Sequence, residues 1–501
     1  MIYLSSCECC IGKCVVFTPV YIVRLSSEIT LKSERTRPRF ERTLLRNIDY
    51  ALRRHGVRGY RVRVVPGRIF IYGATGIERI LTRVFGVHSV SPAVECSFNS
   101  LEDLASKAEE YFRDYVKGRT FAVRPHRFGK HDFTSIDIAR VVGSKLKPYS
   151  RGVDLENPEV EVYVEVRGGK AYFFKEIIKG PMGLPIGTNG YVLALVSGGF
   201  DSPVAVWYTW KRGVRVDIVH FDLAGLEQVY YALRVIKKLI DEWCYGYEPK
   251  IIIVDFKRIV KLILERVRED LKQIVLKRLM YRAASILADK LGAEAIVTGE
   301  SLGQVSSQTL RSLWVSEKPS KYVILRPLLG FDKEEIISKS RELGLYELSS
   351  SVKEFCALVR GATATWPKPE DVDEEEAKIP LDEVLEAVSN AKVYKASEID
   401  LEKMLPWGSL EIDFIPENTI LIDARSRRDY EKWHPKGAIH IDDVDFDKLD
   451  RNKVIIVYCD RGVISLVLAK QLRSKGFKAF SLRGGVERLK SCPLVSTHTL
   501  Q

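Results

Sequence analysis

The sequence has no long hydrophobic run, so we expect no transmembrane helix. None of its segments reaches the roughly 18 consecutive apolar residues that a transmembrane helix needs. The first residues also lack the basic region and the small-residue cleavage site of a secretory signal peptide. We therefore expect a cytoplasmic protein with no membrane partner.

Cysteine is scarce and unevenly placed. The chain has nine cysteines, an odd number, which argues against the disulfide framework of a small secreted protein. Four of them lie close together, at Cys7, Cys9, Cys10 and Cys14. Their spacing fits no zinc or iron–sulfur pattern, and no matching pair of histidines follows. We expect residues 1–19 to be a cysteine-rich extension of unassigned function, with metal binding as the alternative.

Acidic residues are outnumbered by basic ones. The chain has 78 lysines and arginines against 66 aspartates and glutamates, a formal net charge of +12. An excess of this size permits nucleic-acid binding without establishing it. Hydrophobic residues make up 46% of the 501 residues, enough for buried cores. At about 100–200 residues per domain, this length predicts three or four domains.

The sequence lacks a Walker A motif, but it contains a phosphate-binding turn of another kind. An apolar run at 192–196 breaks at the glycines of 197–199, and Asp201 and Ser202 stand where a helix begins, followed by Pro203. Glycines let the backbone approach a phosphate, and the N–H groups of a helix N-terminus favour negative charge. We predict an ATP-binding loop here, with an ordinary strand–turn–helix as the alternative.

Strands and helices alternate after this loop. Helices are expected at about 226–243 and 257–291, and the strands between them are continuously apolar, which is typical of a parallel sheet covered on both faces. Ligands bind at the carboxyl ends of such strands, so we expect three loops to converge on one site. These loops are residues 197–202, 220–221 and 298–300.

Two basic clusters precede the loop. Eleven arginines lie between Arg35 and Arg68, many of them on one face of an expected helix. A second cluster at 124–131 lies beside Phe128 and Phe133. Solvated charged surface would explain both clusters, and contact with RNA phosphates is the functional alternative.

A further cysteine, Cys459, ends an apolar strand near the carboxyl end of the chain. A loop and an expected helix from Ser465 follow it, so backbone N–H groups would point at the sulfur, and Arg461 adds positive charge. Both effects lower the pKa of a thiol, and the thiolate is the form that attacks a sulfur donor. A buried structural cysteine is the alternative.

Taken together, these motifs resemble one family, the tRNA 4-thiouridine synthetases (tRNA sulfurtransferases), in the long form that ends in a rhodanese domain. The segments that carry the resemblance are SGGFDSPVA at 197–205, TGESLGQVSSQT at 298–309, LRPLLGFDKEEI at 325–336, EFC at 354–356 and CDRGVIS at 459–465.

The resemblance implies an α/β multidomain fold. Its expected parts are a cysteine-rich extension at 1–19, a ferredoxin-like α+β domain at 20–75, a THUMP RNA-binding domain at 76–180, a doubly wound parallel-sheet PP-loop ATP-pyrophosphatase domain at 181–365, an acidic linker at 366–400 and a rhodanese α/β domain at 401–501.

It also implies a set of site residues. For ATP binding these are Leu195, Val196, Ser197, Gly198, Gly199, Ser202, His220, Phe221, Lys277, Gly299 and Gln308. The implied catalytic residues are Asp201, which acts through Mg²⁺, Lys333, which tRNA modification requires, Cys459, which carries a persulfide, and Cys356, its partner in a redox disulfide.

The implied reaction is the thiolation of uridine at position 8 of tRNA. ATP adenylates the uracil O4, sulfur from Cys459 displaces AMP, and a Cys356–Cys459 disulfide is then reduced. The implied partners are tRNA, a persulfide donor such as a cysteine desulfurase, a reductant and a second copy of the chain. Three alternatives stay open: sulfur supply to a carrier protein for the thiamine thiazole, a small-molecule ATP-pyrophosphatase, and a non-catalytic tRNA-binding protein.

Overall fold

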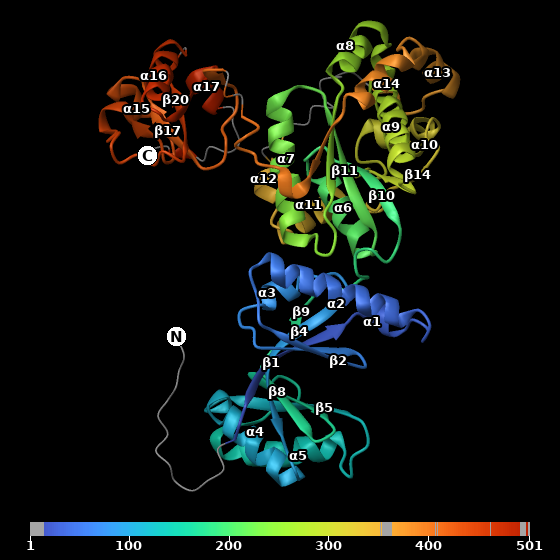
Figure 1. Ribbon diagram of the computed structural model, residues 1–501, viewed down its shortest axis with the longest axis vertical. Coiled ribbons are helices and arrows are strands. Elements are labelled where there is room, and N and C mark those ends of the chain that lie inside the picture. Colours follow the sequence, from blue (N-terminus) through green and yellow to red (C-terminus); the bar gives the residue numbers. More distant parts are fainter. Residues whose placement is uncertain are drawn as a thin grey trace. The chain divides into compact units, whose positions relative to one another are not determined.

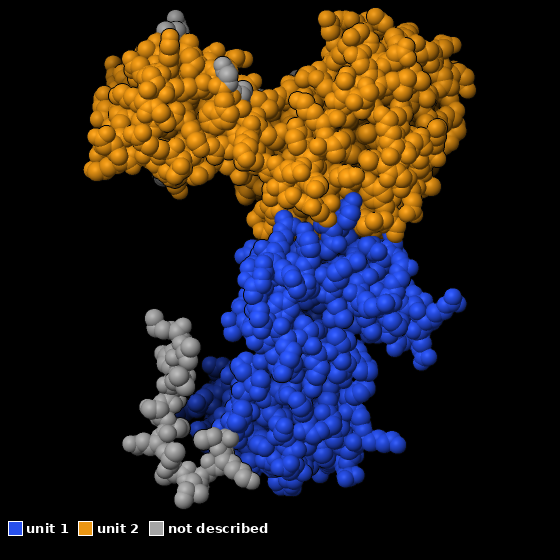
Figure 2. All heavy atoms as spheres, viewed as in Figure 1, with its two compact units in different colours: residues 1–189, 210–213, 245–247 blue, residues 190–209, 214–244, 248–501 orange. Residues whose placement is uncertain are grey.

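The computed structural model describes most of the chain in two compact units (Figure 2). The described residues are 15–350, 352, 363–405, 407, 409–460, 462–490 and 497–498. The first unit is built from 1–189, 210–213 and 245–247, and the second from 190–209, 214–244 and 248–501. Cys356, Arg461 and the four cysteines near the amino end lie outside the described residues. No helix in the described part is long and apolar enough to cross a membrane.

The first unit is organised on one mixed sheet of nine strands among its described residues, in the order β2-β3-β1-β4-β8-β7-β5-β6, with β9 beside β4 (Figure 1). The strands are β1 (Thr18–Leu25), β2 (Arg61–Val65), β3 (Arg68–Tyr72), β4 (Val87–Ser97), β5 (Thr120–Phe128), β6 (Gly152–Val153), β7 (Val160–Arg167), β8 (Lys170–Phe174) and β9 (Ile178–Lys179). Because β4 pairs with both β1 and β8, the ferredoxin-like and THUMP regions share a continuous sheet.

Helices cover the two halves of this sheet separately. The helices are α1 (Ser27–Thr30), α2 (Arg37–Arg54), α3 (Glu78–Leu81), α4 (Leu101–Val116) and α5 (Ser135–Leu146). In α2, Phe40, Leu44, Ile48 and Leu52 are buried against the sheet, as their helical spacing predicts. The opposite face of α2 keeps its arginines outward.

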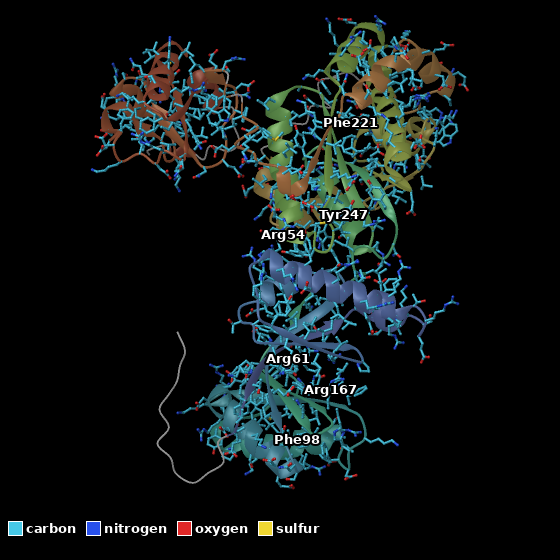
Figure 3. The ribbon with its side chains drawn as sticks, in the orientation of Figure 1. Arg54, Arg61, Phe98, Arg167, Phe221 and Tyr247 are labelled. Carbon is cyan, nitrogen blue, oxygen red and sulfur yellow. The ribbon has the colours of Figure 1, made fainter. Side chains whose placement is uncertain are left out.

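Buried charge ties the two halves together. Glu165 on β7 is almost fully buried, and it accepts hydrogen bonds from Arg68 at 3.2 Å and from Arg167, which is labelled in Figure 3, at 2.6 Å. The Nη2 of Arg24 on β1 lies 3.9 Å from the Oε2 of Glu165. Although burial raises the pKa of Glu165, the neighbouring arginines outweigh this effect and lower the pKa. Removing one partner would leave a buried charge uncompensated, so this cluster fixes the two halves to each other.

The second unit contains the predicted doubly wound sheet, in the order β14-β13-β10-β11-β12-β15. Its strands are β10 (Tyr191–Leu195), β11 (Arg215–Asp222), β12 (Lys250–Asp255), β13 (Ala295–Val297), β14 (Val323–Leu325) and β15 (Lys392–Lys395). All neighbours are parallel except β15, which runs antiparallel to β12. Helices flank both faces (Figure 1). They are α6 (Asp201–Lys211), α7 (Leu226–Trp243), α8 (Lys257–Arg266), α9 (Lys272–Leu291), α10 (Leu310–Glu317), α11 (Lys333–Glu342) and α12 (Tyr346–Ser350).

The single helix expected at 257–291 is wrong, because the structure has two. Val267 ends α8 in an extended conformation, and a 3₁₀ turn at Glu269–Leu271 precedes α9. The backbone N–H of Arg268 donates to the carboxylate of Glu375 at 2.8 Å. A distant side chain therefore takes the amide at the break, which local sequence could not reveal.

The acidic linker expected at 366–400 is a folded part of this unit. Its residues form α13 (Pro369–Ala377), α14 (Leu381–Ser389) and β15. Arg278 of α9 donates to Glu376 at 2.6 Å and to Asp373 at 2.5 Å. The acidic run is therefore paired with arginine and packed against α9, whereas its composition alone indicated a linker.

The last part of the chain forms a parallel sheet in the order β16-β21-β20-β17-β19. Its elements are β16 (Glu411–Ile412), β17 (Thr419–Asp423), α15 (Arg427–Lys432), β18 (His434–Pro435), β19 (Ile439–His440), β20 (Val454–Tyr458), α16 (Val463–Ser474), β21 (Lys478–Leu482), α17 (Gly485–Lys490) and β22 (Thr497–His498). Within the second unit it contacts α7, where the ring of Tyr230 packs at a tilt against that of Phe414, with centroids 4.6 Å apart, and Arg234 pairs with Glu417 at 2.7 Å.

Candidate active site

A cavity of about 350 Å³ lies at the carboxyl ends of β10, β11 and β13. The three loops that we expected to converge do so, and Phe221 at the end of β11 is one of the lining residues (Figure 3). Of the predicted ATP-binding residues, the lining includes Leu195, Val196, Ser197, Gly199, Ser202, Phe221, Lys277, Gly299 and Gln308. The predicted catalytic Asp201 also lines the cavity.

Two of the predicted ATP-binding residues, Gly198 and His220, are not among the residues that line the cavity. Gly198 has a φ of +89°, and a Cβ there would stand 2.7 Å from the Cα of Ala232 on α7. The imidazole of His220 is fully buried, and its Nδ1 lies 2.8 Å from the backbone oxygen of Val196. Burial lowers the pKa of His220, so a neutral ring braces the strand that leads into the loop.

The loop after β10 is held by its own hydroxyl groups. The backbone N–H of Ser197 donates to the Oγ of Ser202 at 3.1 Å, and the two hydroxyl oxygens lie 3.3 Å apart. Asp201 is the first residue of α6 and not its N-cap, and Pro203 lies in the first turn. The helix N-terminus is thereby directed at the cavity that Ser197, Gly199 and Ser202 line.

The carboxylate of Asp201 is held from two sides. The Nζ of Lys333, the first residue of α11, donates to its Oδ1 at 2.8 Å, and the Nε2 of Gln304 donates to its Oδ2 at 3.2 Å. Asp332 caps α11 in a reciprocal capping box with Glu335, which fixes the start of the helix. The structure thus brings together two predicted catalytic residues that are 132 positions apart.

Glu300 lies in one of the three loops that the sequence predicted to converge, but no role was predicted for its side chain. It is buried, and its Oε1 accepts from Lys277 at 2.9 Å, while its Oε2 accepts from Tyr281 at 2.8 Å and from Arg326 at 2.9 Å. Burial raises the pKa of Glu300, but the charges of Lys277 and Arg326 outweigh burial and lower the pKa to about 2. The sequence offered one signal for Glu300, its position directly after the predicted ATP-binding residue Gly299. Its hydrogen-bond partners are dispersed along the chain, so local sequence did not reveal them.

Replacing Glu300 with glutamine is expected to weaken ATP binding selectively. The amide keeps the shape but loses the charge that holds the Nζ of Lys277 at the cavity wall. Because a hydrogen bond to a charged group contributes about 1.5 kcal/mol or more, we expect the KM for ATP to rise about tenfold with a smaller change in kcat. Steady-state kinetics with varied ATP measure this.

The matched control is Glu317→Gln. Glu317 also pairs with Arg326, at 2.6 Å, but it is more exposed and does not line the cavity. A folded Glu300→Gln enzyme with an unchanged KM for ATP, or an equal effect from Glu317→Gln, would show that Glu300 does not position Lys277.

Cys459 lies at the end of β20, in the loop before α16. Its side chain is buried, and its Sγ accepts the backbone N–H of Gly462 at 3.1 Å and lies 3.4 Å from the Oγ of Ser465. Gly485 has a φ of +48°, and a Cβ there would stand 1.9 Å from the backbone oxygen of Cys459. The loop amide predicted to face the sulfur is present at Gly462, and only glycine fits beside the cysteine at 485.

The predicted partner thiol, Cys356, falls outside the described residues, but the chain on both sides of 353–362 is anchored. Val352 lines the cavity. On the other side, the backbone oxygen of Thr365 accepts from the Oγ1 of Thr309 at 2.7 Å, directly after the cavity-lining Gln308. The described residues on either side, Val352 and Thr365, therefore contact the cavity or the chain next to it.

Family models match most of the chain. The model described as "Thiamine biosynthesis protein (ThiI)" matches residues 187–381, a ThiI ferredoxin-like domain matches 20–91, a THUMP domain matches 98–175 and a rhodanese-like domain matches 411–492. A tRNA sulfurtransferase of Desulfurococcus amylolyticus is 44% identical over 475 residues, which is 94% of this chain and 98% of the relative. The chain belongs to the tRNA sulfurtransferase family.

A second relative and two solved structures support the same family assignment. The tRNA sulfurtransferase of Pyrobaculum aerophilum is 43% identical and covers 93% of this chain and 96% of its own. A crystal structure of a 4-thiouridine synthetase–RNA complex with bound ATP has 31% identity and a TM-score of 0.66, and the match covers 75% of this chain and 99% of that one. The structure of PH1313 from Pyrococcus horikoshii Ot3 has 27% identity and a TM-score of 0.52, and the match covers 65% of this chain and 99% of that one. The family assignment and the α/β multidomain fold predicted from the sequence are confirmed.

Both basic clusters are partly used in contacts within the protein. In the first cluster, Arg68 bonds the buried Glu165, and Arg53 of α2 pairs with a neighbouring aspartate at 2.8 Å. In the cluster at 124–131, Arg124 pairs with Glu161 at 2.7 Å. Contact with RNA phosphates stays a prediction for the exposed arginines of α2.

Proposed function

We propose that this sulfurtransferase converts the uridine at position 8 of tRNA to 4-thiouridine, with ATP as the activating substrate and a persulfide as the sulfur source. One observation carries the proposal. The same chain holds a cavity of about 350 Å³ lined by Asp201, whose carboxylate pairs with Lys333, and a loop that directs an amide at the sulfur of Cys459. The solved 4-thiouridine synthetase structure, described with RNA and bound ATP, supports it.

ATP fits the composition of the cavity. Apolar side chains, including Phe221, Leu223 and Met280, offer surface for a purine, and the loop 197–202 offers backbone amides for phosphates. Lys277, held by Glu300, adds positive charge. In this proposal, nine of the eleven predicted ATP-binding residues line the cavity, and the other two, Gly198 and His220, support it.

Activation begins when the uracil O4 attacks the α-phosphate and pyrophosphate leaves. A carbonyl oxygen is a poor leaving group, and adenylation makes it a good one. Lys333 exchanges its bond with Asp201 for contact with phosphate oxygens as negative charge builds there. Asp201 is then free for Mg²⁺, which suits a site with one carboxylate plus phosphates and supplies charge neutralisation when bound.

Sulfur transfer follows at the activated carbon. The terminal sulfur of a Cys459 persulfide attacks C4 and AMP leaves, which links the nucleotide to Cys459 through a disulfide. The Cys356 thiolate attacks the Cys459 sulfur, releases 4-thiouridine and forms the Cys356–Cys459 disulfide. In the other order, Cys356 attacks the persulfide first. Either route ends in a disulfide that a dithiol reductant must reduce.

The decisive measurement is the nucleoside content of transcribed tRNA incubated with the enzyme, ATP, Mg²⁺, a persulfide-loaded cysteine desulfurase and a reductant. We expect 4-thiouridine at position 8, detected by nuclease digestion and mass spectrometry, and none when ATP is omitted. A tRNA that stays unmodified under complete conditions would contradict the proposal.

A second role, as sulfur donor to a carrier protein for the thiamine thiazole, is favoured by the family description matched at 187–381. This role needs the Cys459 persulfide and not the adenylation of RNA. An Asp201→Ala enzyme should therefore still pass sulfur to the carrier protein, whereas a Cys459→Ala enzyme should not.

A further inference from the structure

Two tryptophans are exposed on the surface of the PP-loop region. Trp314 on α10 is 43% exposed and Trp366, just before α13, is 76% exposed. The guanidinium of Arg311 lies 4.7 Å from the ring centroid of Trp314 and 5.7 Å from that of Trp366. The Nζ of Lys318 lies 4.7 Å from the Trp314 ring. Contiguous exposed aromatic surface of this kind marks an interaction site.

This group of residues lies next to the edge of the cavity in which we propose that ATP binds. Val305, Ser307 and Gln308 line the cavity, and α10 begins two residues after Gln308. Val305 is 51% exposed and Leu310 is 73% exposed, so apolar surface runs from the cavity onto α10.

The arrangement is fixed by hydrogen bonds to the chain around Trp366. The Nε of Arg311 donates to the backbone oxygen of Pro367 at 3.2 Å. Thr309 and Ser312 donate to the backbone oxygens of Thr365 and Ala364, at 2.7 and 3.4 Å. These hydrogen bonds hold the chain that carries Trp366 against α10, which carries Trp314. Because the two rings are already held in place, less conformational entropy is lost when a ligand binds.

We propose that Trp314, Arg311 and Trp366 form a stacking platform for unpaired bases of the RNA substrate next to the target uridine. This inference rests on the proposed function, in which the acceptor is RNA. A base that enters an enzyme pocket must leave its stack, so its neighbours lose a stacking partner. Tryptophan rings replace that partner, and an arginine adds cation–π contact and charge for the phosphates.

The charge of the platform favours RNA over a second copy of this chain. A two-fold symmetric interface brings together the same surface patch of both copies, so the positive charges of Arg311 and Lys318 would be gathered twice in one interface. Such like charges oppose association, whereas the polyanionic backbone of RNA attracts them.

The test is the double variant Trp314→Leu, Trp366→Leu. Because stacking contributes about 1–3 kcal/mol per base, we expect the dissociation constant and the KM for tRNA to rise about tenfold or more, with the KM for ATP unchanged. Titration with a short single-stranded RNA should quench the tryptophan fluorescence of the wild type, and this response should be lost in the double variant. The Trp314→Phe, Trp366→Phe enzyme, which keeps two rings, should recover most of the affinity.

Trp407→Leu is the matched control. Trp407 is also exposed, but it packs on Phe480 in the rhodanese region, with centroids 5.0 Å apart. Its loss should leave tRNA affinity and the RNA-dependent quenching intact.

Unchanged tRNA affinity in a folded double variant would overturn the platform. Conversion of a wild-type dimer to a monomer in sedimentation, with tRNA affinity intact, would also overturn it and assign the surface to self-association. A wild-type enzyme whose fluorescence responds to RNA in this way but which forms no 4-thiouridine would contradict the proposed function and leave the platform supported.

Discussion

Replacing Asp201 with alanine is expected to lower the rate of 4-thiouridine formation by at least about 100-fold, the loss typical when a group that stabilises transition-state charge is removed. Asp201 is the carboxylate at the helix N-terminus that Lys333 and Gln304 contact. Without it, Lys333 loses the partner that holds it in place, and the proposed reaction loses the carboxylate that would hold Mg²⁺.

Binding of tRNA and folding should both survive this change. The predicted phosphate-contacting arginines belong to the first unit, so the dissociation constant for tRNA should stay within about twofold. The Asp201–Lys333 pair is partly exposed, and its loss should cost less than about 1 kcal/mol of stability. Pyrophosphate release and 4-thiouridine are the activity measurements, and a filter assay measures tRNA binding.

Asp289→Ala is the matched control for Asp201→Ala. Asp289 pairs with Lys321 on the surface of the same region, at 3.2 Å, and does not line the cavity. It should leave thiolation unchanged. An Asp201→Ala enzyme that retains more than about a tenth of the wild-type rate would exclude a catalytic role for this carboxylate.

Replacing Cys459 with alanine is expected to abolish multiple-turnover thiolation with a persulfide donor while ATP activation continues. The amide of Gly462 that donates to Sγ in the structure would stabilise a thiolate or persulfide there. Alanine removes the only atom that can carry the transferred sulfur in the proposed reaction. We expect no 4-thiouridine above background, with pyrophosphate release in the presence of tRNA still measurable.

The control thiol is Cys96. It is also buried, but burial raises its pKa to about 11, so at neutral pH it is a protonated and unreactive group. Cys96→Ala should therefore leave thiolation intact, even though both substitutions remove a buried sulfur. Sustained turnover by Cys459→Ala with the same donor would refute the persulfide route.

Local sequence determined the two reactive loops. The run from Ser197 to Ser202 specifies a tight turn into a helix, and the run from Cys459 to Ser465 places a thiol before a helix. Both rest on short-range rules: glycines permit the backbone geometry, and helix N-termini present free N–H groups. The family, the α/β fold and the convergence of three loops on one site could all be predicted for this reason.

Tertiary structure decided which side chains meet. Asp201 and Lys333 pair across 132 positions, and Glu300 gathers Lys277, Tyr281 and Arg326. Such pairs are set by the packing of α9 and α11 around the sheet, which no local pattern encodes.

The acidic stretch 366–400 is the clearest case of this division. Its composition indicates a linker, but the arginines of α9 pair with its acidic side chains and β12 pairs with its strand. The sequence by itself determined the chemistry that each loop can perform, because that chemistry depends on neighbouring residues. Only the fold decided which charges are paired and which surfaces stay open, because burial and ion pairing depend on residues brought together from distant parts of the chain.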